Sequence, residues 1–276
     1  MEYISTCKRE FKPQTKFQYS CLNYITLQHI IETITGQSLR DFAKENIFDI
    51  LGMQYTDYLP TIQQQDGKWI NTVACPWMDR IAPTEKQKDG SVLCGQVHDP
   101  LARILNGGIS GNAGIFSNAN DIGILAAALL NGGEYNGRRI LSPLGVKTMC
   151  TVPRELTAFG RTPGWDIFSP YASNKGDLFS PNTFGHTGYT GTSIIIDPDN
   201  DTAVILLVNA VHPEDRHSIV RLRSLVANAV AASICPPAQV YTDHYYKRFL
   251  QFETETPISP KDIVMVGNKI YNFIIN

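Results

Sequence analysis

Two short apolar runs rich in β-branched residues, Ser193 to Ile196 and Ala203 to Val208, flank the turn-forming segment Asp197-Pro198-Asp199-Asn200-Asp201. Aspartate, proline and asparagine favour tight turns, so this pattern predicts an antiparallel β-hairpin. The stretch from Val204 to Val208 is apolar at every position. Such a strand is typical of the centre of a sheet, so we expect helices to cover both faces of this hairpin.

Apolar residues recur at helical spacing on both sides of the hairpin in the sequence. Gly36 is expected to end the first such run, and Gly52 is expected to end the second as a left-handed cap. Ser38 with Asp41 three residues later is a capping signal for the second run. The predicted helices cover residues 22–35, 38–51, 121–130, a segment starting at 142, and 214–234.

These elements together predict an α/β fold of the α+β kind. We expect an antiparallel sheet flanked by helices, joined to a mostly helical region that includes Leu22 to Leu51.

Composition and charge exclude several functions. The 24 basic and 26 acidic residues give a net charge of -2, without runs of like charge, so no nucleic-acid partner is predicted. The longest apolar run, Ile124 to Leu130, is far shorter than the roughly 20 residues that cross a bilayer, so no membrane span is expected. The six cysteines show no CxxC pair and no zinc-ligand spacing, and neither a metal nor an organic cofactor is predicted.

The first residues suggest a location for the chain as given. Residues 1–16 are polar and contain no apolar core of signal-peptide length. The expected location is therefore cytoplasmic, or periplasmic or secreted if an upstream segment is missing.

Two segments contain residue types that carry chemistry. Tyr19 precedes the helix predicted from Leu22, and a tyrosine held near a cation can transfer protons. The alternative for Tyr19 is a packing and capping role. In the second segment, Gly185 to Thr192, glycines allow close backbone approach and free N–H groups can serve an oxyanion. His186 could orient or protonate a substrate there, or be a structural residue.

In this order the two segments resemble the serine β-lactamase and penicillin-binding-protein-like family, which includes class C β-lactamases, D-alanyl-aminopeptidases and family VIII esterases. The resemblance runs through roughly residues 11–234, and further matching blocks are 30–39, 82–85, 111–117, 130–133 and 164–166. It implies a β-lactamase/transpeptidase-like fold that is incomplete. The implied parts are an N-terminal remnant at 1–16 and a partial family domain at 17–235. The tail at 236–276 lies outside the resemblance and is expected to be an appended element or partly disordered.

The resemblance also implies a reaction, which is acyl transfer through a covalent serine ester. Substrates of the family are esters, β-lactams and D-amino-acid or cell-wall peptides. Tyr19 corresponds to the proton-transferring tyrosine, and His186, Thr187 and Gly188 replace the Lys-Thr-Gly triad. The backbone N–H of Tyr189 corresponds to one oxyanion donor.

Two departures from the family pattern affect the expected activity. Cys21 occupies a substrate-binding position that is usually Asn or Asp, and its thiol lacks the hydrogen-bonding capacity of an amide. The Ser-x-x-Lys segment is absent from its expected place. Only Ser5-Thr6-Cys7-Lys8 fits that pattern, and Pro13 limits any helix there to about two turns, too short to be stable alone.

We therefore expect a serine hydrolase domain without its acylatable serine. The alternative is a non-catalytic ligand- or partner-binding module, or a truncated gene product. Without the nucleophile helix, Ile30, Ile31 and Ile34 lose part of their burial. An exposed apolar surface of this kind predicts self-association, or a partner that fills the groove.

Overall fold

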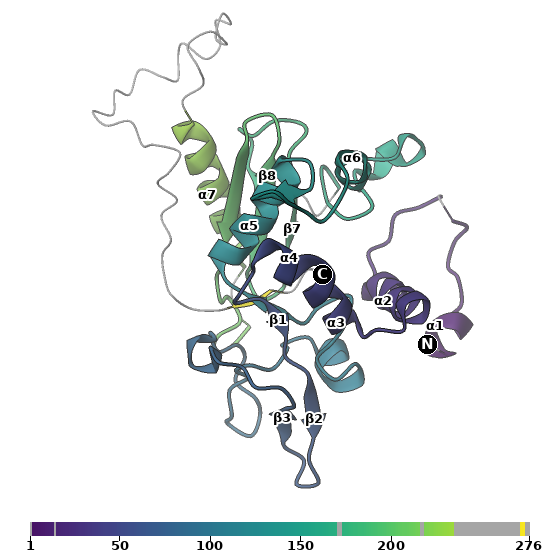
Figure 1. Ribbon diagram of the computed structural model, residues 1–276, viewed down its shortest axis with the longest axis vertical. Helices are drawn as coiled ribbons and strands as arrows, with labels where there is room; N and C mark the ends of the chain where they lie inside the picture. Colours follow the sequence, from purple (N-terminus) through teal and green to yellow (C-terminus); the bar gives the residue numbers. More distant parts are fainter. Residues whose placement is uncertain (1, 14, 170–172, 216–217, 235–270, 274–276) are drawn as a thin grey trace, which may run out of the picture.

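The computed structural model describes residues 2–13, 15–169, 173–215, 218–234 and 271–273 (Figure 1). A three-stranded antiparallel sheet joins β7 (Phe184–Thr187), β8 (Ser193–Asp197) and β9 (Thr202–Leu206) in the order β7-β8-β9. His186 lies opposite Ile194, which in turn lies opposite Ile205. The predicted hairpin is confirmed as β8 and β9.

The position predicted for the 204–208 run is wrong, because β8 and not β9 is the central strand among the described residues. The 184–187 segment pairs with the far side of β8, so β9 has one described neighbour. The prediction of helices on both faces is confirmed. Ile205 packs with α5 (Ala119–Leu130), and Val204 packs with α7 (Val220–Ser233), which explains why β9 is apolar on both faces.

The helical region begins with α2 (Cys21–Thr35), which ends at Gly36 with φ of 71°. A second helical run follows as α3 (Leu39–Ala43), the π-helical segment η1 (Lys44–Phe48) and α4 (Asp49–Leu51). Ser38 Oγ accepts the backbone N–H of Asp41 at 3.1 Å, and Gly52 ends the run with φ of 75°. The predicted caps are confirmed, while the second run contains a π-helical turn that its periodicity did not indicate.

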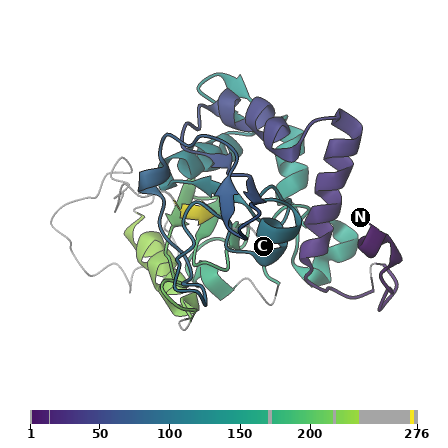
Figure 2. The ribbon, with the colours of Figure 1, turned by 90° about the horizontal axis from the view of Figure 1, so that it is seen from below.

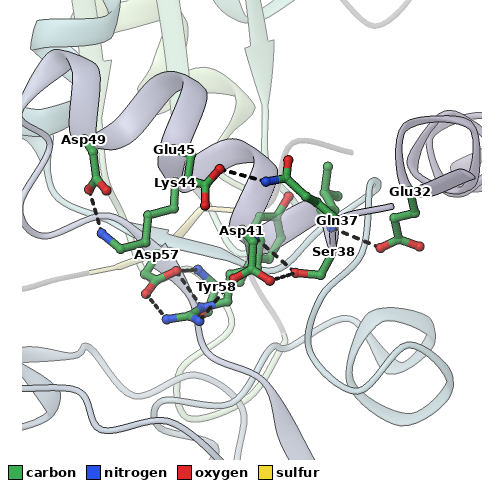
Figure 3. Close-up of polar contacts among 11 residues, drawn as sticks. Glu32, Gln37, Ser38, Asp41, Lys44, Glu45, Asp49, Asp57 and Tyr58 are labelled. Atoms are coloured by element: carbon green, nitrogen blue, oxygen red, sulfur yellow. Dashed lines mark hydrogen bonds and ion pairs between the residues drawn. The ribbon is translucent and has the colours of Figure 1, made fainter. Parts of the chain in front are cut away.

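Charged side chains attach this region to the neighbouring strand β1 (Asp57–Tyr58), as Figure 3 shows. The Arg40 guanidinium donates to both carboxylate oxygens of Asp57, at 2.9 and 2.6 Å. The Glu32 carboxylate accepts the backbone N–H of Leu39 at 3.1 Å and so joins α2 to α3. The first contact therefore joins α3 to β1, and the second joins α2 to α3.

The helix predicted over 214–234 begins later, at Val220. Within the predicted range, the Asp215 carboxylate instead accepts a hydrogen bond from the Tyr189 hydroxyl. The helix predicted from Ser142 is confirmed as α6 (Pro143–Cys150), with Ser142 as its N-cap.

A second three-stranded sheet has the order β1-β4-β10, with β4 at Ile115–Ser117 and β10 at Tyr271–Phe273. Residues 235–270 and 274–276, which include most of the tail predicted from the sequence, lie outside the described residues. The remaining elements are α1 (Glu2–Thr6), β2 (Thr61–Gln63), β3 (Trp69–Asn71), η2 (Met78–Arg80), η3 (Leu101–Leu105), β5 (Glu134–Tyr135), β6 (Arg138–Arg139), η4 (Arg154–Phe159) and η5 (Ser173–Lys175).

Figures 1 and 2 both place α2 at one edge of the molecule, with α1 beside it. None of the α2 side chains is buried. Leu27, Ile30 and Ile34, here called the α2 stripe, share one helix face and are 49%, 45% and 78% exposed. Ile30 and Ile34 are exposed, whereas Ile31 packs partly against a core cluster.

Within the described ranges, no helix combines the length and the apolar character that crossing a bilayer requires.

Candidate active site

A cavity of about 370 Å³ lies against β7 and is lined by residues that are far apart in the sequence. Tyr19 reaches it from the segment before α2, and Arg161 from the loop after η4. His186, Thr187, Gly188 and Tyr189 line it from β7 and the turn that follows. The fold therefore brings together the two segments that the sequence singled out.

Tyr19 is a protonated phenol in this environment. Burial raises its pKa well above the usual value, and the neighbouring Cys21 raises it further, while the positive charge of Arg161 opposes both effects. The Arg161 guanidinium lies over the Tyr19 ring, 5.6 Å from the ring centre. This cation is placed to stabilise a phenolate whenever the hydroxyl gives up its proton.

His186 is neutral at physiological pH. Burial lowers its pKa, and Arg161 lowers it further, against the backbone of Thr187, which raises it. Arg161 Nη1 lies 3.1 Å from His186 Nε2, and a guanidinium can only donate. We therefore assign Nε2 as the acceptor and place the proton on Nδ1, which donates to the Thr187 carbonyl at 3.0 Å. The Thr187 N–H also lies 3.0 Å from Nδ1, but a protonated Nδ1 does not accept from it. The position that carries lysine in the family pattern has no charge here.

Arg161 is a positively charged residue that lines the cavity, and it was not predicted from the sequence. Its side chain is 14% exposed, and its Nε lies 3.6 Å from the Asp166 carboxylate. It also lies over the ring of Phe17. The available signal was its place just before Gly164-Trp165-Asp166, a block that carries the family resemblance.

Cys21 is the first residue of α2 and lies beside the cavity rather than among the residues that line it. Burial and the carboxylate of Asp99 raise the pKa of its thiol, and a hydrogen bond with Asn112 partly opposes them. The Asn112 amide is fully buried and also accepts from Ser110 at 2.6 Å. The Cys21 thiol therefore contacts the side-chain amide of Asn112 from another loop, whereas an asparagine at position 21 would itself provide an amide.

Tyr189 stands at the mouth of the cavity, with its side chain 59% exposed. Its ring stacks on the ring of His98, with 5.7 Å between centres, and its hydroxyl donates to Asp215. The turn that follows is closed by the N–H of Gly188, which donates to the Thr192 carbonyl at 2.7 Å. These contacts hold the backbone of Tyr189 against the cavity.

Ser5 is exposed on α1, where its hydroxyl donates to the Glu2 carbonyl at 2.8 Å. Neither Ser5 nor Lys8 is among the residues that line the cavity with Tyr19. In the described part of the chain, no three His, Cys, Asp or Glu side chains are grouped as a metal-binding cluster.

The fold and the cavity define a protein of the serine β-lactamase and penicillin-binding-protein class. The chain belongs to the β-lactamase family, whose model matches residues 1–228. A protein of Escherichia coli K12 named "Putative D-alanyl-D-alanine carboxypeptidase" is 35% identical over 226 residues, which are 77% of this chain and 49% of that protein. A relative of the same name from Salmonella gallinarum is 33% identical over 226 residues, with the same coverage. The chain thus spans about half the length of the curated relatives it matches.

Solved structures confirm the fold class. A β-lactamase from Mycobacterium bovis superposes with a TM-score of 0.51 at 20% identity, over 80% of this chain and 66% of that one. Simvastatin synthase from Aspergillus terreus superposes with a TM-score of 0.53 at 17% identity, over 80% of this chain and 56% of that one. The resemblance stated from the sequence is confirmed.

Proposed function

We propose that the cavity is the proton-transfer and oxyanion side of an acyl-serine active site. The observation that carries this proposal is the presence of Tyr19 and of His186 to Tyr189 around one cavity. Acyl transfer needs a proton-transfer group beside an oxyanion donor, so their proximity is a chemical requirement of that reaction.

In this proposal each residue has a defined role. The Tyr19 phenol gives its proton to the leaving group, and the resulting phenolate, stabilised by Arg161, takes up the proton of the attacking hydroxyl group. The backbone N–H of Tyr189 donates to the oxyanion of the tetrahedral intermediate. Neutral His186 keeps Arg161 in place through its Nε2.

The charge of the cavity favours substrates that carry a carboxylate. The planar guanidinium of Arg161 matches a carboxylate better than a lysine ammonium does. Its contact with Asp166 is long, at 3.6 Å, so it can accept a second acidic partner. Peptides that end in D-alanyl-D-alanine have such a group, and the names of the relatives point the same way. We propose these peptides as the preferred substrate class, ahead of uncharged esters.

We further propose that this chain binds such peptides without becoming acylated by itself. Ser5, the one serine of the sequence in a Ser-x-x-Lys pattern, is exposed on α1 and does not line the cavity. Binding and acylation are therefore separable properties here.

Titration with diacetyl-L-lysyl-D-alanyl-D-alanine, followed by the amide resonances of His186 to Tyr189, tests this function. We expect saturable shifts with the D,D-peptide and much weaker binding of the L,L-isomer. Arg161→Gln is expected to weaken binding roughly 10- to 100-fold, because a charge-assisted hydrogen bond contributes about 1.5–3 kcal/mol.

Arg138→Gln on β6 is the matched control, since it removes the same charge from an exposed site that does not line the cavity. Arg161→Lys, which keeps the charge, should bind more tightly than Arg161→Gln. Equal affinity for both stereoisomers, or an unchanged affinity in Arg161→Gln, would show that the cavity has another function.

A further inference from the structure

A second arginine lies under the turn that follows β7. Arg223 belongs to α7, and it is only 7% exposed. Its Nη2 donates to the carbonyls of Gly188 at 2.7 Å and Thr192 at 2.9 Å, and its Nη1 donates to Asn174 at 3.3 Å. Among the ion pairs of the described residues, none involves this guanidinium. Its buried charge is therefore directed at backbone carbonyls.

The carbonyl of Gly188 and the N–H of Tyr189 belong to the same peptide group. A trans peptide is planar, and its C=O and N–H point in opposite directions. A donor that holds the Gly188 carbonyl on one side therefore fixes the direction of the Tyr189 N–H on the other side. A cationic donor also polarises the peptide and makes the N–H a stronger donor.

Two backbone hydrogen bonds close the turn independently of Arg223. Gly188 N–H donates to the Thr192 carbonyl at 2.7 Å, and Gly191 N–H donates to the Gly188 carbonyl at 3.1 Å. These two hydrogen bonds close the turn without Arg223. The guanidinium bridges the same two carbonyls and restricts the remaining rotation of the 188–189 peptide.

We propose that Arg223 is a positioning residue that orients and polarises the Tyr189 N–H as an oxyanion donor. The oxyanion role of that N–H rests on the proposed function above, whereas the contact between Arg223 and the 188–189 peptide does not. Arg223 also borders the cavity, and the role proposed here is carried by its contact with the Gly188 carbonyl.

Amide resonances of the ¹⁵N-labelled full chain test the orientation without any ligand. Loss of a hydrogen bond at the Gly188 carbonyl changes the polarisation of the following amide, so Arg223→Met is expected to move the Tyr189 ¹⁵N resonance upfield. Arg223→Lys keeps a charge and one donor, and should give a smaller change. Arg221→Met, an exposed arginine two residues earlier on α7, should leave the Tyr189 resonance unchanged.

A Tyr189 resonance that stays in place in Arg223→Met, or an equal shift of all amides of β7 and β8, would overturn the proposal. If Arg223→Met does not fold, Arg223→Lys decides the question by the same resonance. Titration with the D,D-peptide distinguishes the positioning contact of Arg223 from the oxyanion role of the Tyr189 N–H. A moved Tyr189 resonance with unchanged peptide affinity would leave the positioning contact intact and remove the oxyanion assignment.

Discussion

Replacing Gly185 by alanine is expected to lower the free energy of unfolding by about 3 kcal/mol, the upper end of the usual cost of overpacking. A Cβ at this position would lie 2.3 Å from the Ile194 carbonyl oxygen and 3.2 Å from the Cα of Ile195. Both atoms belong to β8, which is buried along its whole length and pairs with β9 on its other side. The clash cannot be relieved by moving a flexible side chain, so β7 must separate from β8.

The same substitution should also disturb the cavity. Gly185 exchanges two backbone hydrogen bonds of 3.0 Å with Asp166, and Asp166 holds Arg161. Urea unfolding followed by circular dichroism measures the loss. Gly123→Ala in α5 is the control, because its nearest new contact is Ile205 Cδ1 at 3.9 Å. Alanine in a helix interior should stabilise the protein there by about 0.5–1 kcal/mol. A loss below 1 kcal/mol for Gly185→Ala would show that the register of β7 differs from the one described.

The isolated chain is expected to self-associate through the α2 stripe. Leu27, Ile30 and Ile34 place three aliphatic side chains on one exposed helix face. Burying an aliphatic side chain fully contributes about 1.5–3 kcal/mol, so removing three partly exposed ones should weaken association by about 3 kcal/mol, or roughly 100-fold. The triple variant Leu27→Gln, Ile30→Gln, Ile34→Gln should therefore sediment as a monomer at concentrations where the parent chain does not.

The stability of this triple variant should stay close to that of the parent, because these side chains are already largely in water. Leu144→Gln on α6 is the control, since Leu144 is 75% exposed and lies away from α2 in the sequence. Sedimentation velocity distinguishes the outcomes. A parent chain that is monomeric at all concentrations, or a triple variant that associates equally well, would contradict this role for the stripe.

The parts of the fold that were predicted from the sequence depend on local interactions. The hairpin follows from the turn residues 197–201, and the ends of the two helical runs follow from Gly36, Ser38 and Gly52. The central place of β8 could not be predicted in this way, because it depends on pairing with the distant 184–187 segment. The contact between Asp215 and Tyr189 is likewise tertiary, since it joins residues 26 positions apart in the sequence.

The residues of the candidate site also fall into those that local sequence predicted and those that depend on tertiary contacts. Tyr19 and His186 were found because short motifs contain them, and the fold brings both to the cavity. Arg161 and Arg223 belong to no motif that the sequence offered, and their importance appears only from what they touch. Charges that act on a site through a backbone carbonyl or an aromatic ring have no fixed spacing in the sequence. They require the tertiary structure.

Intact mass spectrometry with a fluorescent penicillin tests the central claim most directly, which is that the cavity binds acyl substrates while Ser5 is not acylated. The folded chain is incubated with the penicillin, and bound label is measured with and without the D,D-peptide. We expect reversible binding that the peptide displaces, together with an unchanged intact mass. A stoichiometric adduct on Ser5, or penicillin binding that the peptide leaves unaffected, would contradict the account.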